Sequence, residues 1–159
     1  MEVYLLAVGK VREKFLLDGI EEYAKRLRPY IKLEIREGTE EKVPEDLTAG
    51  RAARIREAEG RSLLRLLPPG AYTIALDRRG RMLSSEELAG YMADLALRGR
   101  SRVAFLIGGT LGLSEEVLAR ADFQWSFSRL TFPHQLMRLL LLEQLYRACK
   151  IQRGEPYHR

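Results

Sequence analysis

Continuous apolar runs bounded by glycine or proline limit what this chain can fold into. Val3 to Val8 and Val103 to Ile107 consist of apolar residues apart from Tyr4, and a glycine follows each of them directly. Ala71 to Leu76 is a similar run that follows two prolines and a glycine. Strands that are covered by crossover helices on both faces have this pattern, whereas a strand with one solvated face alternates apolar and polar residues. The runs therefore predict a largely parallel sheet in an α/β fold.

Helical segments and two further strands lie between these runs. The helices are expected at about 11–28, 50–67, 85–97, 114–121 and 134–151, and the additional strands at 31–35 and 123–127. Ser84 and Glu87 have the spacing of a capping box, which supports the start of the third helix. Ile31 to Ile35 alternates apolar and charged residues, as expected near a sheet edge. We expect five or six strands with helices on both faces, in a single domain spanning residues 1–159.

Three polar stretches complete this expectation. Asp77-Arg-Arg-Gly80 is typical of a turn at the carboxyl end of a strand, where ligands bind in open α/β sheets. Gly38 to Thr48 contains a proline and is expected to be a loop. The helix that follows carries Arg51, Arg54, Arg56, Arg61 and Arg65. These arginines belong either to a solvated face that Glu57 and Glu59 balance or to a surface that contacts phosphates.

Charge and cysteine content indicate the environment and the partners of the chain. The 159 residues carry a formal net charge of +5, which favours a polyanionic partner such as RNA. Cys149 is the only cysteine, no N-terminal signal pattern precedes the first strand, and no apolar run approaches the roughly 20 residues needed to span a bilayer. We therefore expect a cytoplasmic protein with no membrane partner. The two histidines and one cysteine have no metal-ligand spacing, so no metal site is expected.

Two segments are candidate walls of one binding site. The strand Phe105 to Ile107 ends in Gly108 and Gly109, which let backbone approach a ligand with no side chain in the way. In Trp125 to His134, serine and threonine alternate with apolar residues, so hydrogen-bonding groups would lie among apolar side chains. Pro133 can open the last helix. The alternative is an ordinary buried strand, loop and helix.

The last helix is apolar around most of its circumference. Its apolar residues are Leu136, Met137, Leu139, Leu140, Leu141, Leu142, Leu145, Tyr146, Ala148 and Cys149. One face of a sheet cannot cover so wide a surface. Either a second layer of the same chain or another copy of the protein must pack on the remainder, and we expect a homodimer.

Several short motifs occur in order over almost the whole chain. They are Leu76-Asp77 with Gly80 and Ser84-Ser85-Glu86, Leu106-Ile-Gly-Gly109 with Gly112-Leu-Ser114, Ser126-x-Ser128-x-x-Thr131-x-Pro133-His134-Gln-Leu136, Leu145-Tyr-Arg-Ala148, and Pro156-Tyr-His-Arg159. Together they resemble the ribosomal RNA large subunit methyltransferase H family of SPOUT-class enzymes. Thr110 departs from the proline or serine expected there in that family.

The resemblance implies more than periodicity can show. It implies a C-terminal trefoil knot, S-adenosylmethionine bound in that knot, and a homodimer. A knot could not be predicted from the pattern of apolar residues, because knotted topologies are nearly absent among proteins. The resemblance also implies methylation of N3 of a pseudouridine in 23S rRNA, pseudouridine 1915, on assembled ribosomes. The alternative is a non-catalytic basic dimer that binds RNA.

The resemblance also implies roles for particular residues. The cofactor would be held by Leu76, Gly108, Phe127, Ser128, Arg129, Leu130, Thr131 and Phe132. Tyr157, His158 and Arg159 would meet the target base, with His158 helping to remove a proton, and Arg147 could position a phosphate or the cofactor carboxylate. We expect the tail from Gln152 onward to order over the active site when RNA arrives. A frayed terminus with no role is the alternative.

Overall fold

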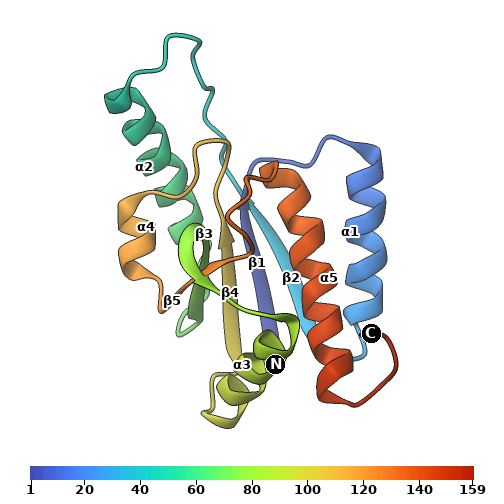
Figure 1. Ribbon diagram of the computed structural model, residues 1–159. Coiled ribbons are helices and arrows are strands. Elements are labelled where there is room, and N and C mark those ends of the chain that lie inside the picture. The colour runs from blue at the N-terminus through green and yellow to red at the C-terminus, as the bar shows by residue number, and fades with distance from the viewer.

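The computed structural model describes residues 1–159 as strands and helices that alternate along the chain (Figure 1). The strands are β1 (Glu2–Val8), β2 (Lys32–Gly38), β3 (Tyr72–Met82), β4 (Arg102–Ile107) and β5 (Phe123–Ser126). The helices are α1 (Lys14–Leu27), α2 (Ala49–Arg65), α3 (Ser85–Leu97), α4 (Glu115–Arg120) and α5 (His134–Gln152). The strands form one five-stranded sheet in the order β2-β1-β4-β3-β5, and every neighbouring pair is parallel. The predicted α/β class is confirmed.

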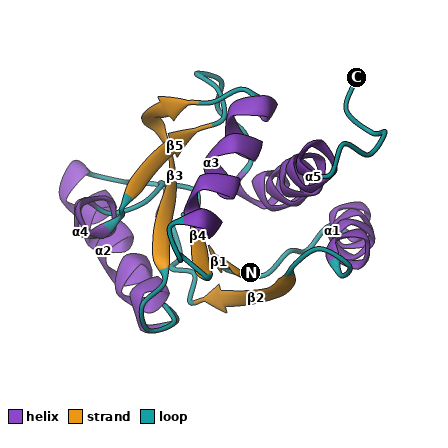
Figure 2. Ribbon diagram, turned by 90° about the horizontal axis from the view of Figure 1, so that it is seen from below, coloured by secondary structure: helices purple, strands orange, loops and turns teal.

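Helices cover both faces of the sheet, as predicted. Figure 2 shows α1, α3 and α5 on one side and α2 and α4 on the other. Successive residues of β1 point to opposite faces, so Val3 and Leu5 belong to the core beneath the first group while Tyr4 and Leu6 belong to the core beneath the second. Because both faces are buried, the strand needs apolar residues at every position. This requirement explains the continuous apolar runs.

Helix α5 is covered largely by the chain itself. It packs between α1 and α3 in the layer on one side of the sheet. Leu141, Leu142 and Leu145 are buried there, whereas Leu136 and Leu140 remain half-buried. The second layer that the sequence left open therefore exists within the chain, and the homodimer stays a prediction.

The structure differs from the sequence prediction at Asp77 to Gly80. These residues do not form a turn after the strand, because β3 continues to Met82. Leu76 and Arg81 pair with the same residue of β5, Trp125, so the residues between them form a bulge. A Cβ on Gly80 would lie 2.6 Å from the backbone of Gln124. The glycine thus allows β3 to approach β5 closely and does not reverse the chain.

Smaller differences concern element limits and one side chain. Helix α1 begins at Lys14, three residues later than the predicted start near residue 11, and β2 extends to Gly38 because it pairs with β1 as far as Val8. The expectation that Glu59 belongs to a solvated face of α2 is wrong. Glu59 is only 3% exposed, since this side of α2 packs toward the core. The capping box of Ser84 and Glu87 is confirmed.

A buried arginine connects α5 to the carboxyl ends of β1 and β2. Arg138 is 2% exposed, and its Nη1 donates to Glu37 Oε2 at 2.7 Å. Its Nη2 donates to the carbonyl oxygens of Val8 at 2.9 Å and Gly9 at 2.6 Å. These bonds fix the N-terminal part of α5 against the carboxyl ends of β1 and β2.

Replacing Arg138 by methionine keeps a long apolar stem but removes all of these hydrogen bonds. We expect the free energy of unfolding to fall by about 2 to 4 kcal/mol, because two carbonyl groups near the core lose a charged donor. Urea unfolding measures the loss. Arg129→Met, at an exposed loop position, is the matched control and should change the stability by less than about 0.5 kcal/mol. Equal effects of the two substitutions would contradict the assignment.

Candidate active site

A cavity lies at the carboxyl ends of β4 and β5 and at the bulge in β3, beside the first turn of α5. Its volume is about 280 Å³, close to the lower end of the roughly 300 to 1,000 Å³ usual for small-molecule sites. The lining residues are Leu76, Asp77 and Arg78 from β3, Ile107 at the end of β4 and residues 108–112 after it, residues 125–128 and 130–132 at and after β5, and His134 and Met137 from α5. The cavity thus brings together the two segments that the sequence indicated as opposite walls.

The wall after β4 is a tight loop made by glycines, called the glycine loop here and comprising residues 108–112. A Cβ on Gly108 would lie 2.5 Å from the carbonyl carbon of Gly112 and 2.8 Å from the amide nitrogen of Leu113. Gly112 has a φ of +85° and donates its N–H to the carbonyl of Gly109 at 3.0 Å. Gly108 is therefore required because the two ends of the loop lie too close together for a side chain. The sequence suggested a different reason, namely an open path to a ligand.

The opposite wall is shaped by its own hydroxyl groups. Ser126 Oγ donates to the carbonyl of Ser128 at 3.0 Å, and Ser128 Oγ accepts from the N–H of Leu130 at 3.1 Å. Arg78 Nη1 donates to Thr131 Oγ1 at 3.0 Å, which joins the β3 bulge to this wall. The serines and the threonine thus fix the shape of the segment.

Two polar atoms at the cavity have no partner within the protein. Trp125 Nε1 and His134 Nε2 are both buried and unbonded, and both residues line the cavity. Burial lowers the pKa of His134, and the nearby Arg138 adds to this effect while Glu40 opposes it. Buried polar groups normally have partners, so a ligand with polar groups fits this site. The sequence motif contained both residues, but no local pattern showed that their nitrogens would be left free.

Most of the residues assigned to the cofactor by resemblance line this cavity. They are Leu76, Gly108, Phe127, Ser128, Leu130, Thr131 and Phe132. Arg129 is exposed and lies outside the lining. Arg78, Trp125 and His134 lie in segments that the sequence indicated, but none of them was assigned a role, and Met137 was not indicated; all four line the cavity.

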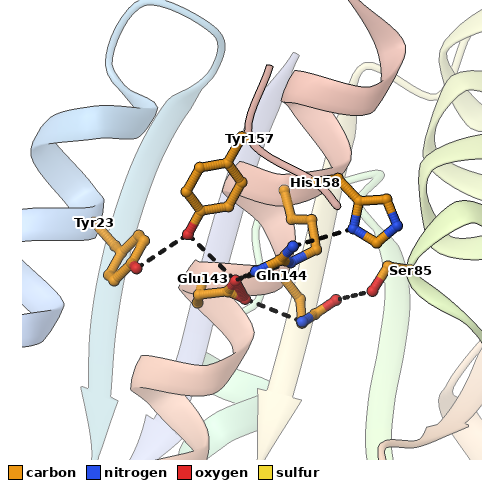
Figure 3. A network of polar contacts seen from close by, with 7 residues as sticks. Tyr23, Ser85, Glu143, Gln144, Tyr157 and His158 are labelled. Carbon is orange, nitrogen blue, oxygen red and sulfur yellow. Dashed lines mark hydrogen bonds and ion pairs between the residues drawn. The ribbon is translucent and has the colours of Figure 1, made fainter. Parts of the chain in front are cut away.

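The C-terminal tail lies elsewhere, folded back along α5 (Figure 3). Tyr157 Oη is 3.1 Å from Tyr23 Oη, and it donates to Glu143 Oε1 at 3.3 Å. Burial and the contact with Tyr23 raise the pKa of Tyr157. The same Glu143 accepts from Arg147 Nε at 2.9 Å. This network fixes the side chain of Tyr157 between Tyr23 of α1 and Glu143 of α5.

His158 is bonded at both ring nitrogens. Its Nδ1 lies 3.1 Å from Arg147 Nη1, and its Nε2 lies 2.6 Å from Glu86 Oε1 at the start of α3. The hydrogen bond with His158 lowers the pKa of Glu86. Arg159, at the end of the chain, is exposed. The tail is therefore held in place by polar contacts. It is not a frayed end, and it does not lie over the cavity of its own chain.

The tail and the cavity of one chain are far apart. His134 lines the cavity at the start of α5, whereas Arg147 contacts the tail 13 residues further along the same helix. A rise of 1.5 Å per residue separates these two positions by roughly 20 Å along the helix axis. No tail residue lines the cavity. A reaction that uses both parts needs either a large movement of the tail or a second copy of the chain.

The fold and the cavity agree with one class of enzyme. A family model described as predicted SPOUT methyltransferase matches residues 1–158. The ribosomal RNA large subunit methyltransferase H of Moorella thermoacetica is 61% identical over 159 residues, covering 100% of this chain and 99% of that protein. The protein of the same name from Clostridioides difficile is 54% identical over the full length of both chains. The chain therefore belongs to the ribosomal RNA large subunit methyltransferase H family of SPOUT methyltransferases.

Solved structures support the fold at much lower sequence identity. A probable methyltransferase from Bordetella pertussis superposes with a TM-score of 0.53 at 14% identity, covering 92% of this chain and 95% of that one. None of the helices has both the length and the apolar character that crossing a membrane requires. No three His, Cys, Asp or Glu side chains come together in a way that could hold a metal ion.

A single methyl group added at Gly108 tests the role of the glycine loop. Because a Cβ at position 108 forces residues 108 and 112 apart and changes the shape of the glycine loop, we expect the affinity for the methyl donor to fall by about tenfold or more, which is ~1.4 kcal/mol. Gly90→Ala is the control, since a Cβ there meets nothing within 4 Å. That helical change should leave binding unaltered and stabilise α3 slightly. Calorimetry on both variants gives the comparison, and unchanged affinity for Gly108→Ala would place the donor elsewhere.

Proposed function

We propose that this protein methylates N3 of a pseudouridine in 23S rRNA, with S-adenosylmethionine as donor and the assembled ribosome as substrate. The target that the family resemblance indicates is pseudouridine 1915. The proposal depends above all on the cavity that joins the glycine loop to residues 126–132. Relatives that match over their full length are named as methyltransferases of large-subunit ribosomal RNA. A ribosomal substrate would also place the protein in the cytoplasm.

The residues of the cavity fit this donor. Leu76, Phe127 and Phe132 offer apolar surface for an adenine ring, and the glycine loop offers backbone groups without side chains. Trp125 Nε1 and His134 Nε2 are free to bond the polar parts of the ligand. Bound there, S-adenosylmethionine supplies a methyl group that is already activated on a sulfonium sulfur. The protein's main task is then to orient donor and acceptor, which can lower a barrier by several kcal/mol.

The acceptor nitrogen carries a proton that must be removed. His158 is the best candidate for this step, because a nitrogen of a neutral imidazole can accept a proton as a general base. Tyr157 can stack on an unpaired base, and Arg159 can bind a phosphate. The base must be out of its stack to reach the methyl group, which costs least in a single-stranded loop.

A homodimer reconciles the positions of the tail and the cavity. The two lie roughly 20 Å apart along α5 in one chain, so the tail of one copy would complete the site of the other. The half-buried Leu136 and Leu140 on α5, near the cavity end of the helix, are available for such a contact. We propose further that residues 1–159 act as a single domain. The trefoil knot stays a prediction of the resemblance.

A non-catalytic RNA-binding dimer is the second candidate function. It would use the net charge of +5 and the arginines of α2, most of which are exposed. It would not need a cavity with two unpaired buried nitrogens at the carboxyl ends of β4 and β5 and the bulge in β3. The cavity therefore favours the enzyme. Binding of S-adenosylmethionine in a calorimeter separates the two functions, because the RNA-binding dimer would show none.

Deleting Tyr157, His158 and Arg159 tests the role of the tail. We expect methyl transfer to ribosomes to be abolished while the affinity for S-adenosylmethionine stays within about threefold of the wild type, or ~0.7 kcal/mol, because the tail is outside the cavity. The assay uses ribosomes from cells that lack the protein, with mass mapping of 23S rRNA to locate the methyl group. Retained methylation would refute the role of the tail, and loss of donor binding would assign the tail to the donor site.

Mixing a tail-deleted variant with a Gly108→Ala variant tests the shared site, at a donor concentration low enough that Gly108→Ala alone is nearly inactive. The tail-deleted variant lacks residues 157–159. After the chains are exchanged in equal amounts, half of the dimers are mixed and each mixed dimer has one complete site, so about a quarter of the wild-type rate should return. No recovery in a mixture whose chain exchange has been verified by mass would show that tail and cavity act within one chain.

A further inference from the structure

A buried glutamate on α2 lies directly against the glycine loop. Glu59 is 3% exposed, and a Cβ on Gly109 would lie 3.0 Å from its Oε1 and 3.2 Å from its Oε2. No side chain separates the carboxyl group from the backbone of the loop. Gly109 lines the cavity and Glu59 does not, so Glu59 can affect a ligand there only through the loop.

The carboxyl group is only partly satisfied. Oε2 accepts the N–H of Glu41 at 3.0 Å, whereas Oε1 is buried and has no hydrogen-bond partner. A buried carboxyl oxygen without a partner destabilises the fold, because it has lost its contact with water and gained no donor. Helix α2 could avoid this cost with an apolar residue at the same position. A carboxyl group at this position is better explained by a contact that forms in another state of the protein.

The neighbouring residues of α2 join two further segments. A Cβ on Gly60 would lie 2.6 Å from Ser114 Oγ, at the N-cap of α4, so α2 and the chain just beyond the glycine loop are in close contact. Ser62 Oγ accepts the N–H of Thr39 at 2.7 Å. Residues 59–62 therefore hold both the glycine loop and the chain leaving β2, and Glu59 is the member that touches a cavity residue.

Burial raises the pKa of Glu59, and the negative charges of Glu40 and Glu41 raise it further, while the hydrogen bond from the N–H of Glu41 opposes the shift. Residues 107–114, which include the glycine loop that faces it, carry no ionisable side chain. Protonation of Glu59 is therefore easier than for an ordinary carboxyl group. The neutral form can donate a hydrogen bond as well as accept one.

We propose that Glu59 is a positioning residue for the methyl-donor site, whose Oε1 bonds to a backbone group of the glycine loop when the donor is bound. This inference rests on the proposed function. Glu59 lies on the inner side of the loop and would hold the loop in the shape that binds the donor. The cavity residues would contact the donor itself. The same carboxyl group connects the loop to the chain leaving β2 through Glu41.

Three variants separate a positioning role from a structural one. Glu59→Gln retains the shape and a hydrogen-bonding group at each terminal atom, so the affinity for S-adenosylmethionine should stay within about twofold of the wild type, or ~0.4 kcal/mol. Glu59→Leu removes the polar atoms and should weaken binding by about tenfold, or ~1.4 kcal/mol, without lowering the melting temperature. Glu57→Leu, at an exposed position on the same helix, is the control and should leave affinity unchanged.

The pH dependence of binding gives an independent measurement. The neutral carboxyl group of Glu59 can donate a hydrogen bond to the loop and the carboxylate cannot, so the affinity of the wild type should fall as the pH rises through the raised pKa of Glu59. Glu59→Gln should lack this step. His134 titrates in both proteins, so its contribution cancels in the comparison.

The outcomes decide the proposal as follows. Wild-type affinity in a folded Glu59→Leu variant would overturn it, and so would a parallel loss of melting temperature and affinity in both Glu59 variants. If Glu59→Leu does not fold, the pH profiles of the wild type and Glu59→Gln decide, and identical profiles would overturn the proposal. A wild-type protein that does not bind S-adenosylmethionine would instead refute the proposed function, and this inference with it.

Discussion

The hydrogen bonds of Arg138 fix the geometry on which the site depends. The guanidinium group crosses from α5 to the carboxyl ends of β1 and β2, where it meets two backbone carbonyls and Glu37. One turn earlier on α5 lies His134, and Met137 is adjacent, so both lining residues take their positions from this anchor. A buried guanidinium group is strongly unfavourable in any arrangement that leaves it unpaired. Arg138 therefore admits only one placement of α5 against the sheet.

The strand order explains why the cavity forms where it does. In the sequence β2-β1-β4-β3-β5, strands β4 and β5 lie on either side of β3, and all three run in the same direction. The glycine loop after β4, the bulge in β3 and the segment after β5 must then meet at the same end of the sheet, where the strands reach their carboxyl ends. Segments that are separated along the chain by α3 and α4 become the walls of one site. Helix α5, which follows β5, then closes the site with its first turn.

Local patterns were sufficient for the elements whose environment is uniform along their length. The apolar runs predicted β1, β3 and β4, and the pairing of Ser84 with Glu87 predicted the start of α3, because burial and capping each leave a signal within a few residues. The bulge at Asp77 to Gly80 left no such signal, since Gly80 serves the close approach of β5, which follows two helices later. Glu59 was predicted to be exposed for a related reason. A charged residue is normally expected at the surface, and the contacts that bury Glu59 come from segments distant in the sequence.

The candidate site was predictable to a similar degree. Glycines after a strand and a hydroxyl-rich segment before a helix indicated both walls of the cavity. The free nitrogens of Trp125 and His134 could not be foreseen from the sequence. A polar atom is unpaired only when none of its neighbours in the fold offers a hydrogen-bond partner, and those neighbours come from several segments of the chain. The position of the tail depends on side chains from α1, α3 and α5, among them Tyr23, Glu86 and Glu143, and no short window of sequence contains them together.

The two edges of the sheet have a consequence for how copies of this protein can associate. Strand β2 presents the exposed Lys32 and Glu34, and β5 is only four residues long. Charged and short edges resist the addition of a foreign strand, so the sheet is protected from growing into a continuous β structure between molecules. Specific association between copies is left to helical surfaces, where side-chain packing sets the partner and the geometry.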